Sequence, residues 1–190
     1  LKERLRKAVA ILNPNIPHEA QEQAIQKVLR IYSPDLLFNN ESFHKELVEK
    51  VKIPYQKDGF ERSYEVALID FETPLNNEFL VVNQYTIVER NQNKRPDLLL
   101  FVNGIPLVVI ELKNAADENA TMRKAYEQLQ TYKATIPSLF TYNTICVISD
   151  GLECKAGTIS AGFSRFMAWK TADGKKEASR FVPQLEILLK

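Results

Sequence analysis

Two apolar runs meet at an Asn-Gly dipeptide in the stretch RPDLLLFVNGIPLVVIELK, residues 95–113. Asn103-Gly104 is a strong signal for a tight β-turn, because both residue types tolerate positive φ angles. The two runs are therefore predicted to form a hairpin of adjacent strands. The first run begins at Asp97 and the second ends at Glu111 and Lys113. Two acids and a lysine are thus expected at one end of an apolar hairpin.

The register of this hairpin decides whether the two acids share a face of the sheet. Glu111 and Lys113 are two residues apart on one strand and therefore point to the same face. A two-residue loop would pair Asp97 with Ile110 and direct the two acids to opposite faces. A three-residue connection, or a bulge near Pro106, would instead set Asp97 across from Glu111. The first register predicts ordinary strand-end acids, and the second predicts a shared site.

In the second register the two carboxylates would bind one cation between them. Carboxylate oxygens are hard ligands that suit Mg²⁺, with Mn²⁺ as a substitute, and the backbone carbonyl of Leu112 offers a further oxygen. A bound cation would polarise a phosphate and lower the pKa of a bound water. Lys113 would orient that water or stabilise charge on the phosphorus. Without a cation, the two acids would raise one another's pKa.

The predicted helices and strands of the chain contain a core in the order αβββαβ. The predicted helices cover 17–31, about 40–54 and 121–136, and the predicted strands cover 61–72, 79–90, the two hairpin runs and 142–151. The last strand is nearly continuous in apolar residues, which is typical of a strand covered on both faces. This order predicts an α/β fold in which helices flank a mixed central sheet. The segment after Gly151 is expected to pack at the edge of that sheet.

Composition and charge limit the possible functions. The 190 residues are 45% apolar, which suits one well-packed domain better than two. The formal net charge is only +1, whereas a domain that holds nucleic acid through many phosphate contacts is usually far more basic. Cys146 and Cys154 form no CxxC pair and are expected to be reduced thiols of a cytoplasmic protein. No apolar run is long enough to cross a membrane.

The acid and lysine pattern resembles the PD-(D/E)xK nucleases, with Pro96-Asp97 followed by Glu111-Leu112-Lys113. QLQTY, Gln128 to Tyr132, matches the QxxxY signature of the RecB-like branch, and its two outer residues share one helical face. Residues 67–87, 95–115 and 164–174 resemble the amino-terminal region of the R (HsdR) subunits of type I restriction–modification enzymes. The resemblance extends over about residues 17–175.

The resemblance implies a restriction-endonuclease-like core and one endonuclease domain over residues 1–190, as a fragment of a larger R subunit. It implies a type I site-specific deoxyribonuclease that hydrolyses double-stranded DNA with Mg²⁺, using Asp97, Glu111 and Lys113 as catalytic residues. No phosphate-binding GxxxxGK[ST] run occurs here, so the ATP-driven motor is expected elsewhere. The complete enzyme would include methyltransferase (M) and specificity (S) subunits and depend on ATP and S-adenosylmethionine.

Several further residues are candidates for the same site. The resemblance implies that Gln128 and Tyr132 position a DNA phosphate or brace the ligands; alone, they would be an ordinary helix-face pair. Glu22 is a further candidate metal ligand, with a plain surface glutamate as the alternative. Four basic residues near strand ends would contact the DNA backbone or form a solvated rim: Arg62, Arg90, Lys94 and Arg95.

Two other functions fit the same residues. One is a non-catalytic module in which the nuclease fold docks on a DNA translocase. The other is a stand-alone PD-(D/E)xK nuclease that acts without ATP. The intact set of predicted catalytic residues argues against the first alternative, and near-neutral charge predicts weak DNA binding and little cutting by the isolated chain.

Overall fold

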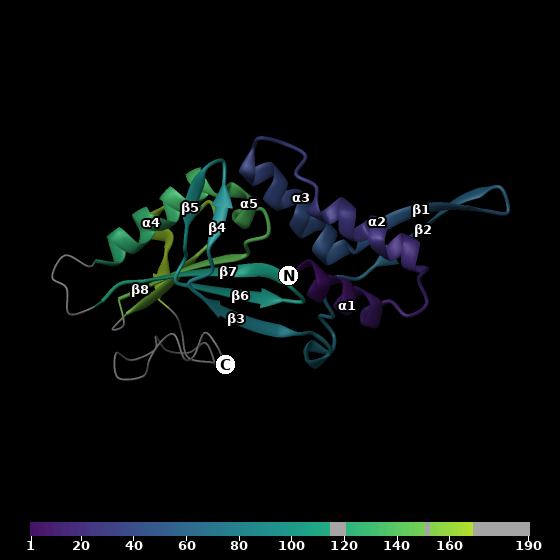
Figure 1. Ribbon diagram of the computed structural model, residues 1–190, viewed down its shortest axis with the longest axis horizontal. Helices are drawn as coiled ribbons and strands as arrows, with labels where there is room; N and C mark the ends of the chain where they lie inside the picture. The colour runs from purple at the N-terminus through teal and green to yellow at the C-terminus, as the bar shows by residue number, and fades with distance from the viewer. Residues whose placement is uncertain (115–120, 151–152, 169–190) are drawn as a thin grey trace. The chain divides into compact units, whose positions relative to one another are not determined.

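The computed structural model describes residues 1–114, 121–150 and 153–168, and the structural statements below concern these residues (Figure 1). The chain divides into two compact units, Leu1–Val81 with Leu100–Pro106 and Val82–Leu99 with Leu107–Lys190. Both contain helices and strands, so the predicted α/β class is confirmed, whereas the single endonuclease domain stays a prediction. Within the described residues, no helix combines the length and the apolar character needed to cross a bilayer.

Three helices open the first unit: α1 (Lys2–Leu12), α2 (His18–Leu29) and α3 (Leu36–Glu49). The helix predicted over 17–31 corresponds to α2, which buries Ala24, Ile25 and Val28 at helical spacing. Asp35 begins α3, because its side chain accepts hydrogen bonds from the amides of Leu37 and Phe38. The predicted caps, Asn40 and Ser42, lie inside the helix instead.

The second predicted helix is too long, because α3 ends at Glu49 and a strand follows. Lys50 has a φ of 63°, which stops the helix, and β1 (Val51–Lys57) pairs antiparallel with β2 (Phe60–Val66). Val51 and Ile53 are buried while Lys52 and Pro54 are exposed, so this stretch alternates as a strand does. Figure 1 shows β1 and β2 as a long two-stranded ribbon.

The strand predicted over 61–72 ends early, at Val66, and belongs to this ribbon rather than to the central sheet. Beyond it, the carboxylate of Asp70 accepts hydrogen bonds from the amides of Glu72 and Thr73. These bonds hold a turn that leads into the short 3₁₀ helix η1 (Pro74–Asn76). Leu68 is nevertheless fully buried, so its apolar character reflects the core and not a strand.

A six-stranded sheet has the strand order β10-β9-β8-β7-β6-β3. Its strands are β3 (Phe79–Asn83), β6 (Leu98–Val102), β7 (Ile105–Leu112), β8 (Ile145–Ser149), β9 (Cys154–Gly157) and β10 (Met167–Ala168). β7 and β8 are parallel, while β8 and β9 are antiparallel, so the predicted mixed sheet is confirmed. β9 and β10 lie at one edge, as expected for the segment after Gly151, up to residue 168.

The second unit also holds the helix predicted after the hairpin. α4 (Met122–Thr135) packs against β8, and the short α5 (Pro137–Phe140) follows it. Val109, Ile110, Val147 and Ile148 are fully buried on the paired strands, which explains the nearly continuous apolar sequence of β8. The strand predicted over 79–90 is two strands, because Gln84 (φ 53°) interrupts it. The second piece, β4 (Ile87–Glu89), pairs with β5 (Gln92–Lys94) in a separate hairpin.

Candidate active site

The turn between β6 and β7 is the tight two-residue form. Asn103 and Gly104 separate the strands and have φ angles of 53° and 80°, as a type I′ turn requires. Only glycine fits at position 104, because a Cβ there would lie 2.7 Å from the carbonyl oxygen of Leu1. The three-residue connection is therefore wrong, and the bulge near Pro106 is the surviving route to a shared site.

The hydrogen bonds of β7 agree with such a bulge. A regular two-residue hairpin would direct the backbone groups of odd-numbered β7 residues toward β6. Instead, the Leu107 carbonyl accepts from Thr144, and the Lys113 amide donates to Ser149 beyond β8. From Leu107 onward the backbone groups of odd-numbered residues thus point toward β8. The alternation of hydrogen-bonding direction along β7 has therefore shifted by one residue at Pro106. The Leu112 amide consequently faces the other way, toward Asp97.

Asp97 is held by three hydrogen bonds from two residues. Its Oδ2 accepts from the Leu112 amide at 2.8 Å. Its Oδ1 accepts from Nε2 of Gln84 at 3.1 Å, and its backbone carbonyl accepts from the Gln84 amide at 2.8 Å. Sequence reasoning missed Gln84, because it was placed inside one continuous strand. The polar pair Asn83-Gln84 within an otherwise apolar run was the signal available.

Glu111 is the buried acid of the site, with only 3% of its surface exposed. Its Oε1 accepts a hydrogen bond from Nζ of Lys113 at 2.8 Å. Its Oε2 is buried and has no hydrogen-bond partner among the described residues. Burial raises the pKa of Glu111, the Lys113 hydrogen bond lowers it, and the charge of Asp97 raises it again. The charge of Asp97 therefore acts on Glu111, and a cation shared by the two carboxylates stays a prediction.

Helix α4 adds Tyr132 and Gln128 to the acids. Tyr132 is buried, and its hydroxyl lies 3.5 Å from the carbonyl of Arg95. Burial raises the pKa of Tyr132, the charge of Glu111 raises it further, and a hydrogen bond from Gln128 opposes both. The phenol thus stays protonated at neutral pH and donates. Gln128 thus acts on the hydroxyl of Tyr132, the other predicted residue of this helix.

The donor set suits a cation that keeps part of its water shell. The described residues contain no group of three or more His, Cys, Asp or Glu side chains placed to hold a metal. Two carboxylates are, however, the usual protein contribution to an Mg²⁺ site, because Mg²⁺ retains waters and binds substrate phosphate. The unpartnered Oε2 of Glu111 fits this role, since a buried carboxylate oxygen without a donor is costly unless a cation neutralises it. The carbonyl of Leu112 stays a predicted ligand.

The remaining candidates are distributed over both units. Glu22 lies on α2 in the first unit and forms an ion pair with Arg6 at 2.8 Å, so its role as a ligand stays a prediction. Arg62 lies on β2, also in the first unit. Lys94 ends β5, and the exposed Arg95 follows it, two residues before Asp97. Arg62 therefore belongs to a different unit and a different strand from Lys94 and Arg95.

A comparison with known protein families decides what kind of chain carries this site. Residues 1–165 match the model of the type I restriction enzyme R protein N terminus. This chain belongs to that family. The family membership agrees with the pattern of Asp97, Glu111 and Lys113, although the match by itself assigns no role to any of them.

Two relatives show how far the family likeness extends. The type I restriction enzyme HindI endonuclease subunit of Haemophilus influenzae is 42% identical over 98% of this chain. A Methanocaldococcus jannaschii protein, provisionally named as the type I restriction enzyme MjaIXP endonuclease subunit, is 36% identical over 90% of the chain. The chain spans only 18% and 16% of the lengths of these two relatives. The similarity therefore concerns the N-terminal part of the R subunits of type I restriction enzymes, and not their whole length.

Proposed function

We propose that this chain is an Mg²⁺-dependent endonuclease domain that hydrolyses phosphodiester bonds of double-stranded DNA. The observation that carries the proposal is the buried, unpartnered Oε2 of Glu111, which lies on the carboxylate that Lys113 contacts and whose pKa responds to Asp97. A structural ion pair would satisfy both oxygens. A carboxylate that keeps one oxygen free and buried is suited to a cation.

Asp97 and Glu111 would hold the cation, with the Leu112 carbonyl as a further oxygen. The bound Mg²⁺ supplies Lewis-acid polarisation of the phosphate and a more acidic bound water. Gln84 and the Leu112 amide occupy Asp97 through N–H donors, which fixes the direction of its carboxylate without consuming all of its lone pairs. The chain thus orients one acid by hydrogen bonds and the other by burial.

Lys113 has two consecutive tasks in this proposal. In the cation-free fold its ammonium neutralises Glu111, with 25% of the lysine side chain exposed. With a cation held by Glu111, the Lys113 ammonium would be available to a water or a phosphate oxygen in front of the acids. Its backbone amide is bonded to Ser149, so the residue itself stays fixed in the sheet.

Tyr132 and Gln128 would act on the same phosphate or brace Glu111. The protonated Tyr132 hydroxyl would brace the buried acid, and Gln128 would act on that hydroxyl from the same face of α4. Lys94 and Arg95 would contact the DNA backbone near Asp97. Both are at least partly exposed, as a phosphate contact requires.

The proposal extends to the complete enzyme only through the family. We infer an R subunit whose ATP-dependent motor lies outside this chain and which acts with methyltransferase and specificity subunits and S-adenosylmethionine. A non-catalytic module docked on a translocase would keep the fold but would have no use for a free oxygen on Glu111. A stand-alone nuclease would cut DNA without ATP.

The deciding experiment substitutes Lys113 in the assembled enzyme and follows two reactions. Lys113→Ala is expected to abolish DNA cleavage, by about 10³-fold or more, while ATP hydrolysis continues at its normal rate. Lys124→Ala, an exposed lysine on α4, is the matched control and should leave both reactions unchanged. Normal cleavage by Lys113→Ala would disprove the proposal. Cutting of plasmid DNA by the isolated chain without ATP would instead favour the stand-alone nuclease.

A further inference from the structure

Two small hairpins stand apart from the six-stranded sheet, and they differ in charge. The β1–β2 hairpin, residues 51–66, carries three cations and three acids. The segment 85–96, which contains β4 and β5 and is called the arm below, carries three cations and a single acid. Arg90, Lys94 and Arg95 are those cations. The arm alone thus holds more net positive charge than the whole chain, whose sum is +1.

The one acid of the arm is already engaged. Glu89 Oε2 accepts hydrogen bonds from the Ser138 amide at 3.1 Å and from the Ser138 hydroxyl at 2.6 Å. Its charge therefore faces the start of α5, where backbone amides favour a carboxylate. Most side chains that the arm exposes from residue 90 onward are cationic or amide-bearing, namely Arg90, Asn91, Gln92, Asn93 and Arg95, while Tyr85, Thr86 and Val88 are exposed on its first strand side.

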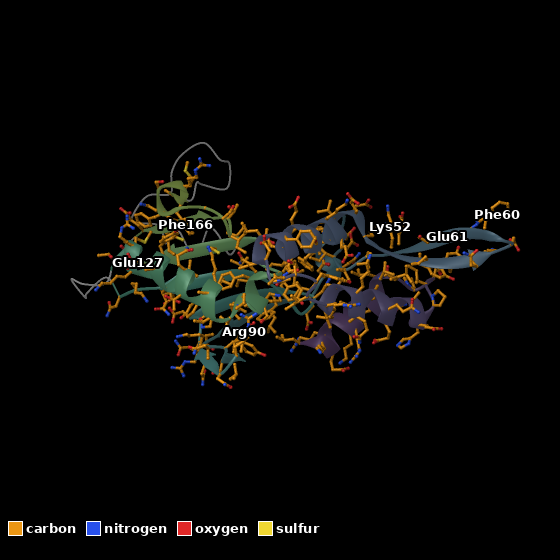
Figure 2. All side chains as sticks on the ribbon, turned by 90° about the horizontal axis from the view of Figure 1, so that it is seen from above. Lys52, Phe60, Glu61, Arg90, Glu127 and Phe166 are labelled. Atoms are coloured by element: carbon orange, nitrogen blue, oxygen red, sulfur yellow. The ribbon has the colours of Figure 1, made fainter. Side chains whose placement is uncertain are left out.

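The tip of the arm places an arginine in a conformation that arginine seldom adopts. Arg90 and Asn91 form the turn between β4 and β5 with φ angles of 49° and 63°, although neither is glycine. A glycine would satisfy this turn without strain, so the arginine is unfavourable for the fold at this position. Strained side chains of this kind are typical of functional contacts. Figure 2 shows Arg90 on this hairpin and Phe60 and Glu61 at the end of the other.

The arm is tied directly to the candidate active site. Gln84 and Asp97 close its base through two hydrogen bonds, so the arm begins and ends at a proposed cation ligand. The Arg95 carbonyl lies 3.5 Å from the hydroxyl of Tyr132, a candidate residue of that site. A phosphate bound along the arm would therefore be held at a set distance from Asp97.

We propose that residues 85–96 form a DNA-contacting arm, in which Arg90 at the tip binds a phosphate of the duplex and the Gln84–Asp97 pair transmits that position to the acids. The inference rests on the proposed nuclease function. Two-stranded ribbons with arginine and amide side chains are established DNA-binding elements, because they match groove and phosphate geometry. The charge-balanced β1–β2 hairpin lacks this complementarity.

A photocrosslink tests the arm without requiring cleavage. A benzophenone side chain replaces Arg90 in the full-length subunit, assembled with its partner subunits and labelled double-stranded DNA, in the Lys113→Ala background. Crosslinking to DNA is expected from position 90. The same probe at Glu61, an exposed residue of the β1–β2 hairpin, is the matched control and should give none. Crosslinks from position 90 to a protein subunit, or equal DNA crosslinking from both positions, would overturn the proposal.

A second pair of variants measures the contribution to cutting in the otherwise unmodified enzyme. Arg90→Ala should raise the DNA concentration for half-maximal cleavage roughly tenfold, as the loss of one charge-assisted hydrogen bond predicts, with unchanged ATP hydrolysis. Lys57→Ala removes an exposed cation from β1 and should have no effect. Equal losses from both variants would contradict the arm. A DNA crosslink at position 90, together with a failure of the enzyme that retains Lys113 to cut DNA, would reject the nuclease and keep the arm.

Discussion

Gln84 and Asp97 are joined by two hydrogen bonds, one between their backbones at 2.8 Å and one from Nε2 of Gln84 to Oδ1 of Asp97 at 3.1 Å. Gln84 reaches this position with a φ of 53°, which is unfavourable for a residue with a side chain. The backbone conformation and the side-chain bond thus serve the same acid. This pairing suggests that Gln84 positions Asp97 for its proposed ligand role.

Gln84→Gly separates the side-chain contribution from the backbone strain. Glycine keeps the amide bond to Asp97 and relieves the strain, so the free energy of unfolding should stay equal or rise by up to about 1 kcal/mol. The carboxylate loses one donor, and Mn²⁺ affinity measured by calorimetry should fall by roughly tenfold. Asn83→Ala, one residue earlier, serves as the control. Unchanged Mn²⁺ affinity in Gln84→Gly would show that the side chain does not orient Asp97.

Glu111 should make cation binding depend on pH. Burial raises its folded pKa above the ordinary value, so the cation-free fold binds the proton more tightly than the unfolded chain does. Its contribution to stability is therefore complete below the ordinary pKa and is lost as pH rises through the raised one. Because Mn²⁺ requires the ionised form, its affinity should increase over that same rise and then level off.

The measurement is calorimetry of Mn²⁺ binding across pH in two buffers of different ionisation enthalpy, which counts the released protons. Glu111→Gln should abolish both binding and proton release. Glu127→Gln changes an exposed acid of α4 (Figure 2) and should preserve both. Binding that is independent of pH would exclude Glu111 as a ligand.

Gly104→Ala should destabilise the β6–β7 turn. An alanine would adopt a φ of 80° at a cost of roughly 1–2 kcal/mol, and its Cβ would approach the Leu1 carbonyl oxygen to 2.7 Å. The free energy of unfolding, measured by denaturant, should therefore fall by at least that amount. Gly59→Ala lies in a turn with a φ of 77° but with no atom within 4 Å of the new Cβ, so it should cost only the conformational part.

Cys146 should be unreactive in the native protein. Burial raises its pKa to about 11, against a weaker opposing effect of the Lys133 charge, so the thiolate is scarce at pH 8. Its contribution to stability is present below the ordinary pKa of 9.0 and is lost as pH rises toward 11. Labelling of this thiol by a disulfide reagent should require denaturant. In Cys146→Ala, the corresponding decline in stability between pH 9 and 11 should disappear. Fast native labelling at pH 8 would contradict the burial.

Much of the architecture could be predicted from periodicity. The helical spacing before Pro137 predicted α4, and the apolar run before Asp150 predicted β8, because both patterns reflect burial on defined faces. β1 was missed, since Pro54 was taken as the end of a helix, whereas this proline lies in an edge hairpin where no amide donor is needed. Local composition carries little information about such long-range pairing.

The candidate site was predictable where it depends on residue type and unpredictable where it depends on geometry. Asp97, Glu111 and Lys113 were predicted from their places at the ends of the hairpin, and Gln128 and Tyr132 from the family resemblance. The role of Gln84 depends on its φ angle and on a contact made thirteen residues later, and neither is visible in a linear pattern. The one-residue shift in the hydrogen-bonding pattern of β7 at Pro106 likewise depends on how the strands pair. The sequence was compatible with this shift but did not predict it over the regular register.

The hydrogen bond from the Leu112 amide to Asp97 has a consequence for how the protein would register a bound ion. The Asp97 carboxylate accepts the hydrogen bond that a backbone carbonyl of a neighbouring strand would otherwise accept from the Leu112 amide. A change at Asp97 should therefore also change how often the end of β7 frays. The exchange rate of this single amide proton is thus an internal gauge of the aspartate, readable by magnetic resonance with no substrate present.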